Sequence, residues 1–110
     1  MKPIPSSAKE RKRYILIKIE SESRVEKTDV EKLVIQAGLQ FLGELGMARA
    51  GIQLIEDTWN PEKQTAIIRT GHKFVDETKA ALALIKQFNN KKITISALKV
   101  SGVIDKLKNG

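Results

Sequence analysis

FLGELGMARA, residues 41–50, is the stretch that decides the fold, because a long apolar helix ends there at glycine and a strand follows. Upstream, Thr28 and Glu31 have the spacing of a capping box, which predicts that the helix begins at Thr28. Apolar residues then recur at helical spacing up to Gly46, a natural helix stop. They are Val30, Leu33, Val34, Ala37, Phe41 and Leu45. A strand is predicted over residues 51–57, directly after this helix.

The rest of the chain extends this helix–strand unit in both directions. Residues 13–20 alternate between apolar and polar side chains, as a half-buried strand does. Further strands are predicted over residues 64–70 and 92–100, with an Asn-Pro turn before the first of these. A second helix is predicted from Phe74 to Phe88, and a short last helix over residues 103–107.

The resulting order, βαββαβ followed by a helix, predicts an α/β (α+β) fold. Right-handed crossovers and short connections favour a ferredoxin-like or RNA-recognition-like sandwich. In this sandwich a four-stranded antiparallel sheet of order 4-1-3-2 carries two helices on one face, and the short C-terminal helix follows. We expect residues 1–10, which are polar and contain two prolines, to form a flexible basic arm. Residues 11–110 are expected to form a single RNA-recognition-like domain.

Composition limits the classes of protein that the chain can belong to. A length of 110 residues suffices for one modest hydrophobic core. No apolar run approaches the roughly 20 residues of a membrane helix, and no signal peptide precedes the fold, so no membrane association is expected. The chain has no cysteine and a single histidine, His72, which excludes disulfides and disfavours a zinc site. We expect a cytoplasmic protein with no metal or cofactor of its own.

Positive charge is concentrated at the two ends of the chain. Residues 1–27 carry eight Lys/Arg and four Glu, and residues 91–110 carry five Lys and one Asp, so each end has a net charge of +4. Residues 28–90 carry seven Lys/Arg and eight Asp/Glu, a net charge of −1. This distribution favours a polyanion partner such as nucleic acid, although basic ends can also merely keep a small domain soluble. The strand order 4-1-3-2 would bring both ends to one edge of the sheet.

Aromatic residues are too few for the base stacking that RNA recognition motifs use on their central strands. The first strand offers only Tyr14, and the third strand offers none. Phe41, Phe74 and Phe88 all have the spacing of helical core positions. We therefore expect the protein to contact structured RNA through phosphates rather than to read single-stranded bases by stacking.

Four short motifs in a fixed order give a resemblance to a known family. They are KRYI (residues 12–15), FLGELGMARA (41–50), AIIR (66–69) and LKVSGVIDKLK (98–108). Together they resemble archaeal ribonuclease P protein component 2, over about residues 12–108. The resemblance implies a non-catalytic protein subunit of the ribonuclease P ribozyme, which supports RNA-catalysed, Mg-dependent removal of 5′ leaders from precursor tRNA.

The same resemblance implies partners and site residues. The partners would be ribonuclease P RNA, which would hold the Mg²⁺, and ribonuclease P protein component 3, a TIM-barrel-like subunit; self-association is also implied. The candidate RNA-binding residues are Arg11, Lys12, Arg13, Arg69, Lys99, Lys106 and Lys108. Of these, Arg13, Arg69, Lys99 and Lys106 lie within the motifs, whereas Arg11 and Lys108 are chosen mainly for their charge.

The first helix carries more apolar surface than one core needs. Ile35, Leu39 and Leu42 form a second stripe, roughly 120° or more round from the centre of the first face. Either the terminal helix covers this stripe or the stripe is a protein interface. Trp59, in the predicted turn, is either a local packing residue or an anchor for a partner, since Trp is enriched at interfaces.

Signals for catalysis are weak, and two other functions stay open. His72, at the start of the second helix, is interpreted as a surface or capping residue, and Glu56, Asp57 and Glu62 as solvated turn residues rather than a magnesium site. One alternative is a generic structured-RNA-binding domain, for example a ribosome-associated one. The other is a small acylphosphatase-like enzyme, which would need a glycine-rich phosphate loop after the first strand, whereas residues 21–27 contain no glycine.

Overall fold

The chain has a mixed α+β fold built on an antiparallel sheet. The computed structural model describes residues 11–108, so the basic arm predicted over residues 1–10 lies outside the described residues. The elements are β1 (Lys12–Ser21), α2 (Lys27–Ala50), β2 (Gln53–Leu54), β3 (Thr65–Gly71), the 3-10 turn η1 (His72–Phe74), α3 (Val75–Ala83), β4 (Gln87–Phe88), β5 (Lys91–Ser101) and α4 (Asp105–Lys108). Among residues 11–108, no helix has both the length and the apolar character needed to cross a bilayer.

Within residues 11–108, the sheet has five strands in the order β2-β3-β1-β5-β4. All neighbouring strands pair antiparallel, and the four predicted strands have the predicted neighbours. The predicted count of four is wrong because the second helix ends at Ala83 and the chain forms the short strand β4 instead of continuing to Phe88. The reason lies in the turn that follows: Asn89 and Asn90 both have positive φ, 52° and 65°. Two such residues make a tight hairpin, and asparagine tolerates this backbone region well.

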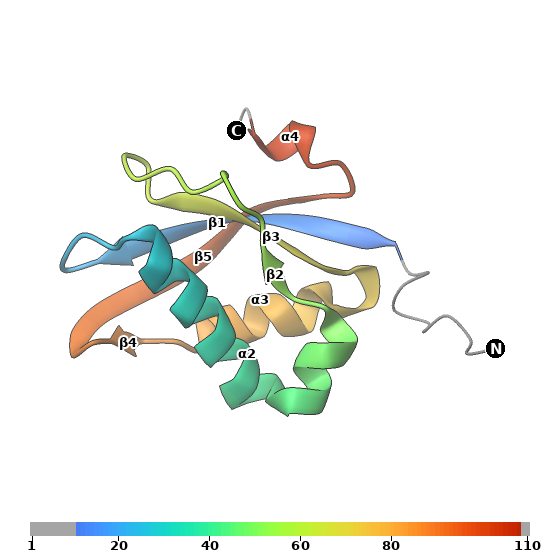
Figure 1. The fold of residues 1–110 in the computed structure, drawn as a ribbon, viewed down its shortest axis with the longest axis horizontal. Coiled ribbons are helices and arrows are strands. Elements are labelled where there is room, and N and C mark those ends of the chain that lie inside the picture. Colours follow the sequence, from blue (N-terminus) through green and yellow to red (C-terminus); the bar gives the residue numbers. More distant parts are fainter. Residues whose placement is uncertain (1–10, 109–110) are drawn as a thin grey trace.

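The main core lies between one face of the sheet and the helices α2 and α3. Ile15, Ile17 and Ile19 alternate along β1 toward this face and are fully buried, as the sequence predicts. Figure 1 shows α2 and α3 below the sheet and α4 above it. The core is completed mainly by Val30, Leu33, Val34 and Ala37 of α2, Ala66 and Ile68 of β3, Leu82 of α3, and Ile93 and Ile95 of β5.

Helix α2 differs from the predicted helix at both ends. It is capped by Glu26, whose backbone N–H donates to Asp29 Oδ2 at 3.1 Å, and not by the predicted pair of Thr28 and Glu31. At its other end the helix passes Gly46 and continues to Ala50, where Gly51 caps it with a left-handed backbone (φ 63°). The helical pattern of the sequence therefore identifies the helix correctly but misplaces both termini.

A break at Gly43 divides α2 into two segments. Its backbone (φ 76°, ψ 172°) is far from helical values, in a region that is close to glycine-only. Beyond the break the chain folds back, so that a Cβ added to Gly38 would lie 1.8 Å from Met47 Sδ. A straight helix would separate residues 38 and 47 by roughly 13 Å along its axis. This break explains why Phe41 and Leu45, both predicted to be in the core, are exposed.

The strand predicted over residues 51–57 is much shorter in the structure, spanning only Gln53–Leu54. Thr58 is the physical reason, because its hydroxyl takes over the role of a strand partner. Thr58 Oγ1 donates to the carbonyl of Ile55 at 2.6 Å and accepts from the N–H of Ile67 at 3.1 Å. A side-chain hydroxyl that satisfies backbone groups in this way competes with a regular ladder.

Helix α4 lies on the other face of the sheet, which we call the open face. Leu107 is only 1% exposed and packs against Leu16 of β1 and Ile67 of β3, with Tyr14 at the margin. Of the two alternatives for the apolar stripe of the first helix, coverage by the terminal helix is therefore wrong, since α2 and α4 lie on opposite faces. The alternation of β1 supplies the reason: its even-numbered apolar residues need a cover of their own.

Candidate nucleic-acid interface

The candidate cations at the start of β1 diverge. Arg11 is exposed, and its carbonyl accepts the N–H of His72 at 3.0 Å. Lys12 Nζ lies 3.6 Å from the position that a Cβ on Gly51 would take, beside the end of α2. Arg13 Nη1 lies 3.1 Å from the corresponding position on Gly102, in the turn before α4. Lys12 and Arg13 thus extend toward different neighbours, and Arg13 is the one near the basic C-terminal segment.

Arg69 lies on β3 directly opposite Tyr14 of β1. Its guanidinium donates to the side-chain oxygen of Gln53 on the neighbouring strand β2. Its Nε atom is buried and finds no hydrogen-bond partner among residues 11–108. This cation is therefore held near the β2 edge of the sheet, and its predicted contact with RNA stays a prediction.

The C-terminal cations gather at the open face. Lys99 of β5 pairs with Leu16, so it shares the face on which α4 lies. Lys106 and Lys108 are exposed on α4 itself. The prediction that the first and last long strands are neighbours is confirmed by the β1–β5 ladder, and it is this ladder that brings Lys99 beside the first strand.

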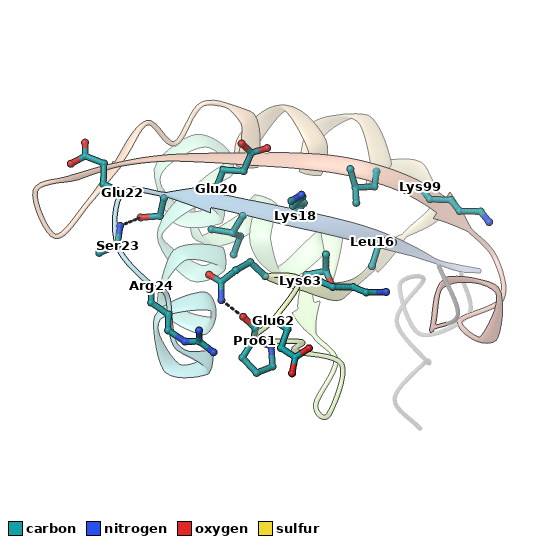
Figure 2. A pocket seen from close by; sticks show the side chains of 15 residues that line it. Leu16, Lys18, Glu20, Glu22, Ser23, Arg24, Pro61, Glu62, Lys63 and Lys99 are labelled. Atoms are coloured by element: carbon teal, nitrogen blue, oxygen red, sulfur yellow. Dashed lines mark hydrogen bonds between the residues drawn. The ribbon is translucent and has the colours of Figure 1, made fainter.

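Two adjoining hollows on the open face form what we call the open-face groove. The larger, of about 830 Å³, lies between β1, β5 and the turn at residues 61–65 (Figure 2). The smaller, of about 580 Å³, shares Leu16 and Lys63 with it and extends to Leu107 and Lys108. Lys18 and Lys99 line the larger hollow. The groove thus contains Lys99 and Lys108, which were predicted, and Lys18 and Lys63, which the sequence analysis missed.

Of these two lysines, only Lys18 can be assigned to the open face from the sequence. Lys18 lies two residues after Leu16 on β1, so strand alternation alone assigns both to the same face. Lys63 belongs to the turn before β3, and its position depends on how that turn is closed. Asn60 Oδ1 accepts the N–H groups of Glu62 and Lys63, both at 3.0 Å, which closes the turn. In this conformation Lys63 lines both hollows of the open face.

The apolar stripe on α2 is solvent-exposed in the isolated chain. Ile35 is 52% exposed and Leu39 is 46% exposed, while Leu42 is half-buried near the break. Leu45, which lies beyond the break, is 64% exposed and adds further exposed apolar surface to α2. Trp59, the other candidate interface residue, is half-buried and packs against the main core, which supports the interpretation as a packing residue.

The residues considered for catalysis are not drawn together. His72 Nδ1 lies 3.3 Å from the carbonyl oxygen of Arg11, linking η1 to the start of β1. Within residues 11–108, no group of three or more His, Cys, Asp or Glu side chains is placed to hold a metal ion. Glu56, Asp57 and Glu62 are all exposed.

Comparison with known proteins identifies the family. The model of the Rpp14/Pop5 family matches residues 13–110. The chain is 36% identical to ribonuclease P protein component 2 of Pyrococcus abyssi, over 98% of this chain and 90% of that protein. It is 33% identical to the protein of the same name from Methanocaldococcus jannaschii, over 98% of this chain and 78% of that protein.

A solved structure shows the same fold at much lower identity. A chain of the cryo-EM structure of yeast ribonuclease MRP superposes with a TM-score of 0.67 and 14% identity, over 84% of this chain and 75% of that chain. At this identity the likeness concerns the fold alone. The family match and these relatives explain the four motifs of the sequence. The chain belongs to the Rpp14/Pop5 family, the family of ribonuclease P protein component 2.

Proposed function

We propose that this chain is a non-catalytic protein subunit of ribonuclease P, which supports RNA-catalysed, Mg-dependent removal of 5′ leaders from precursor tRNA. The observation that carries the proposal is membership of the Rpp14/Pop5 family over residues 13–110, together with relatives of one name along nearly the whole chain. We also propose that the fold is a ferredoxin-like or RNA-recognition-like sandwich enlarged by the short strand β4, which the packing of α2 and α3 on one face of the antiparallel sheet supports.

The proposed mechanism is electrostatic support of the catalytic RNA. A net charge of +7 with the excess at both ends favours phosphate contacts, and the candidate cations are Arg11, Lys12, Arg13, Arg69, Lys99, Lys106 and Lys108. A protein that binds only the folded form of an RNA raises the population of that form. The RNA would then hold the Mg²⁺ and perform the chemistry, and the protein would work in the cytoplasm.

Reconstitution tests this proposal. Cleavage of precursor tRNA by ribonuclease P RNA and component 3 is measured with and without this chain, at a Mg²⁺ concentration low enough that the RNA alone is nearly inactive. We expect the chain to increase the rate and to show no cleavage in the absence of the RNA. Equal binding to ribosomal RNA and ribonuclease P RNA, with no increase in rate, would instead support a generic RNA-binding domain.

For component 3, we propose that the exposed stripe of α2 is the docking surface. Ile35 and Leu39 are about half exposed and lie on the face of α2 away from the core. Burying an apolar side chain of this size contributes about 1.5–3 kcal/mol relative to exposure. Leu39→Asp should therefore weaken a complex with component 3 while leaving the thermal midpoint of the isolated chain nearly unchanged.

The matched control for this experiment is Ala80→Asp, which adds the same charge to an exposed position of α3. Co-purification with tagged component 3 measures the complex, and sedimentation of the chain alone measures self-association. If Leu39→Asp leaves the complex intact but dissociates a dimer of the chain, the stripe is the surface for a second copy. If neither assembly changes, the stripe is exposed in the holoenzyme as well.

A further inference from the structure

A bulge in β5 shapes the part of the open-face groove that Leu98 and Lys99 line. Leu16 of β1 pairs with Lys99 and Ile17 pairs with Ala97, so Leu98 is left without a partner in the β1–β5 ladder. Regular alternation would send the side chains of Leu98 and Lys99 to opposite faces. Both nevertheless line the larger hollow, and Leu98 is 53% exposed there. Bulges commonly re-aim side chains near functional sites, and this one adds an apolar and a cationic group to the same groove.

The groove combines an apolar floor with a cationic end. Leu98, which is 53% exposed, supplies most of the floor, because Leu16 beside it is only 8% exposed. Figure 2 shows Lys18, Lys63 and Lys99 around Leu16. The lysines come from separate segments: β1, the turn before β3, β5 and, for Lys108, α4. The acidic side chains that line the larger hollow are Glu20, Glu22 and Glu62, and Figure 2 shows the first two toward the other end of β1.

This combination matches a ligand that has both a chain of negative charges and uncovered apolar surface. We propose that the open-face groove binds a single-stranded segment of RNA. Its phosphates contact Lys18, Lys63, Lys99 and Lys108, and its ribose and base faces lie on Leu98, the exposed apolar residue of the groove. A duplex fits less well, because its bases are paired and covered and only its phosphate ridges would meet the groove.

The groove tolerates many sequences, because α4 occupies the part of the sheet where an aromatic side chain could stack bases. Tyr14, the aromatic residue of β1, packs at the margin of the cluster formed by Leu16, Ile67 and Leu107. Without an aromatic platform, affinity depends mainly on the lysines, so it falls steeply with salt. Helix α4 therefore replaces base reading on this face with a phosphate contact from Lys108.

This inference rests on the proposed function, which supplies the RNA, and the test separates the two. A labelled oligouridylate, which has no secondary structure, is titrated with the chain at several salt concentrations, and fluorescence anisotropy gives the affinity. The variant Lys18→Gln/Lys63→Gln removes two exposed charges from the groove. Its matched control, Lys32→Gln/Lys79→Gln, removes two exposed charges from α2 and α3.

We expect the groove variant to have a shallower slope of log affinity against log salt by about 1.4, or about 0.7 for each lysine–phosphate pair that the variant removes. The control variant should keep a slope close to that of the wild type. Lys18→Arg/Lys63→Arg should retain binding because it keeps the charges. Leu98→Ser should weaken binding by severalfold without changing the slope, since it removes apolar surface and no charge.

Three outcomes would overturn the proposal: equal loss of slope in the groove and control variants, an unchanged slope in the groove variant, or competition by polyglutamate as strong as that by oligouridylate. The last outcome would identify an acidic peptide as the ligand. Precursor-tRNA cleavage by the reconstituted holoenzyme is followed in parallel. Stimulation by the wild-type chain without groove-dependent oligouridylate binding would reject this site and leave the proposed function standing. The reverse result would reject the proposed function and leave the site standing.

Discussion

Replacing Gly38 by alanine tests the folding back of α2, because two opposing effects of known size meet at this position. In an ordinary helix interior, alanine is more favourable than glycine by about 1 kcal/mol. Here the added Cβ would lie 1.8 Å from Met47 Sδ and 2.9 Å from Met47 Cγ, so the methionine must leave its place. Overpacking of this kind typically costs about 1–3 kcal/mol. We expect Gly38→Ala to lower the free energy of unfolding by about 1 kcal/mol.

Shortening Met47 removes the steric clash with the Cβ added at Gly38. In a Met47→Ala background the side chain has no Sδ or Cγ, so Gly38→Ala should raise the free energy of unfolding by about 1 kcal/mol through helix propensity alone. The two effects differ by about 2 kcal/mol, which is the coupling that a double-mutant cycle should report. Ala80→Gly, at an exposed position of α3, measures the propensity difference in the same protein.

Urea unfolding followed by far-ultraviolet circular dichroism, with linear extrapolation, gives the four free energies. A Gly38→Ala change that stabilises the protein equally in both backgrounds would refute the reasoning, because it would mean that Met47 does not lie on Gly38. In that case α2 would run on as one straight helix, and the non-helical backbone at Gly43 would have no role in the fold.

Three further changes test separate features by urea unfolding. Gly43→Ala should cost about 1–3 kcal/mol from backbone strain alone, since no heavy atom lies within 4 Å of the added Cβ; an unchanged midpoint would contradict the break in α2. Leu107→Ala should cost up to about 1.5–3 kcal/mol through lost burial, and a cost near zero would show that α4 is not seated on the open face. Asn90→Ala should cost about 1–2 kcal/mol because of its left-handed backbone, whereas Asn90→Gly should be tolerated; equal losses would contradict the hairpin turn.

Local periodicity was sufficient to predict most of the fold. The alternation of β1 identified its buried residues, and the helical spacing from Val30 to Ala37 identified the buried face of α2. The rules for handed crossovers then gave the neighbours of β1 correctly. These features follow from one element at a time, which is why sequence patterns capture them.

The errors concern places where backbone conformation or distant packing decides the structure. Gly43 and Gly46 look alike in the sequence, yet the helix breaks at the first and continues through the second. The pattern from Phe74 to Phe88 stays apolar at helical spacing, although the Asn89-Asn90 turn requires a strand before it. The side of the sheet on which α4 packs depends on which apolar surface is left uncovered, and no local pattern encodes that choice.

The sequence likewise predicts only some of the cations that line the open-face groove. Lys99 lies within one of the four motifs and Lys108 is chosen mainly for its charge, so the sequence identifies both as candidates, and both line the groove. Lys18 and Lys63 lie outside the four motifs, so the resemblance does not select them. Strand alternation places Lys18 on the open face, whereas Lys63 depends on the closed turn and Leu98 on the bulge in β5.

The position of β1 at the centre of the sheet has a consequence for the order in which the protein can be assembled. β1 is the first strand to be synthesised, yet one of its two ladder neighbours, β5, and the helix that covers its outer face are the last elements. Long-range pairing of this kind slows folding. A growing chain therefore leaves the ribosome with the edge of β1 that pairs with β5 unpaired and its apolar residues incompletely covered. A ribosome-stalling sequence fused directly after Ser101 would hold β5 inside the exit tunnel, so the nascent chain should be sensitive to protease. Moving the stalling sequence further from Ser101, so that β5 clears the tunnel, should remove this sensitivity.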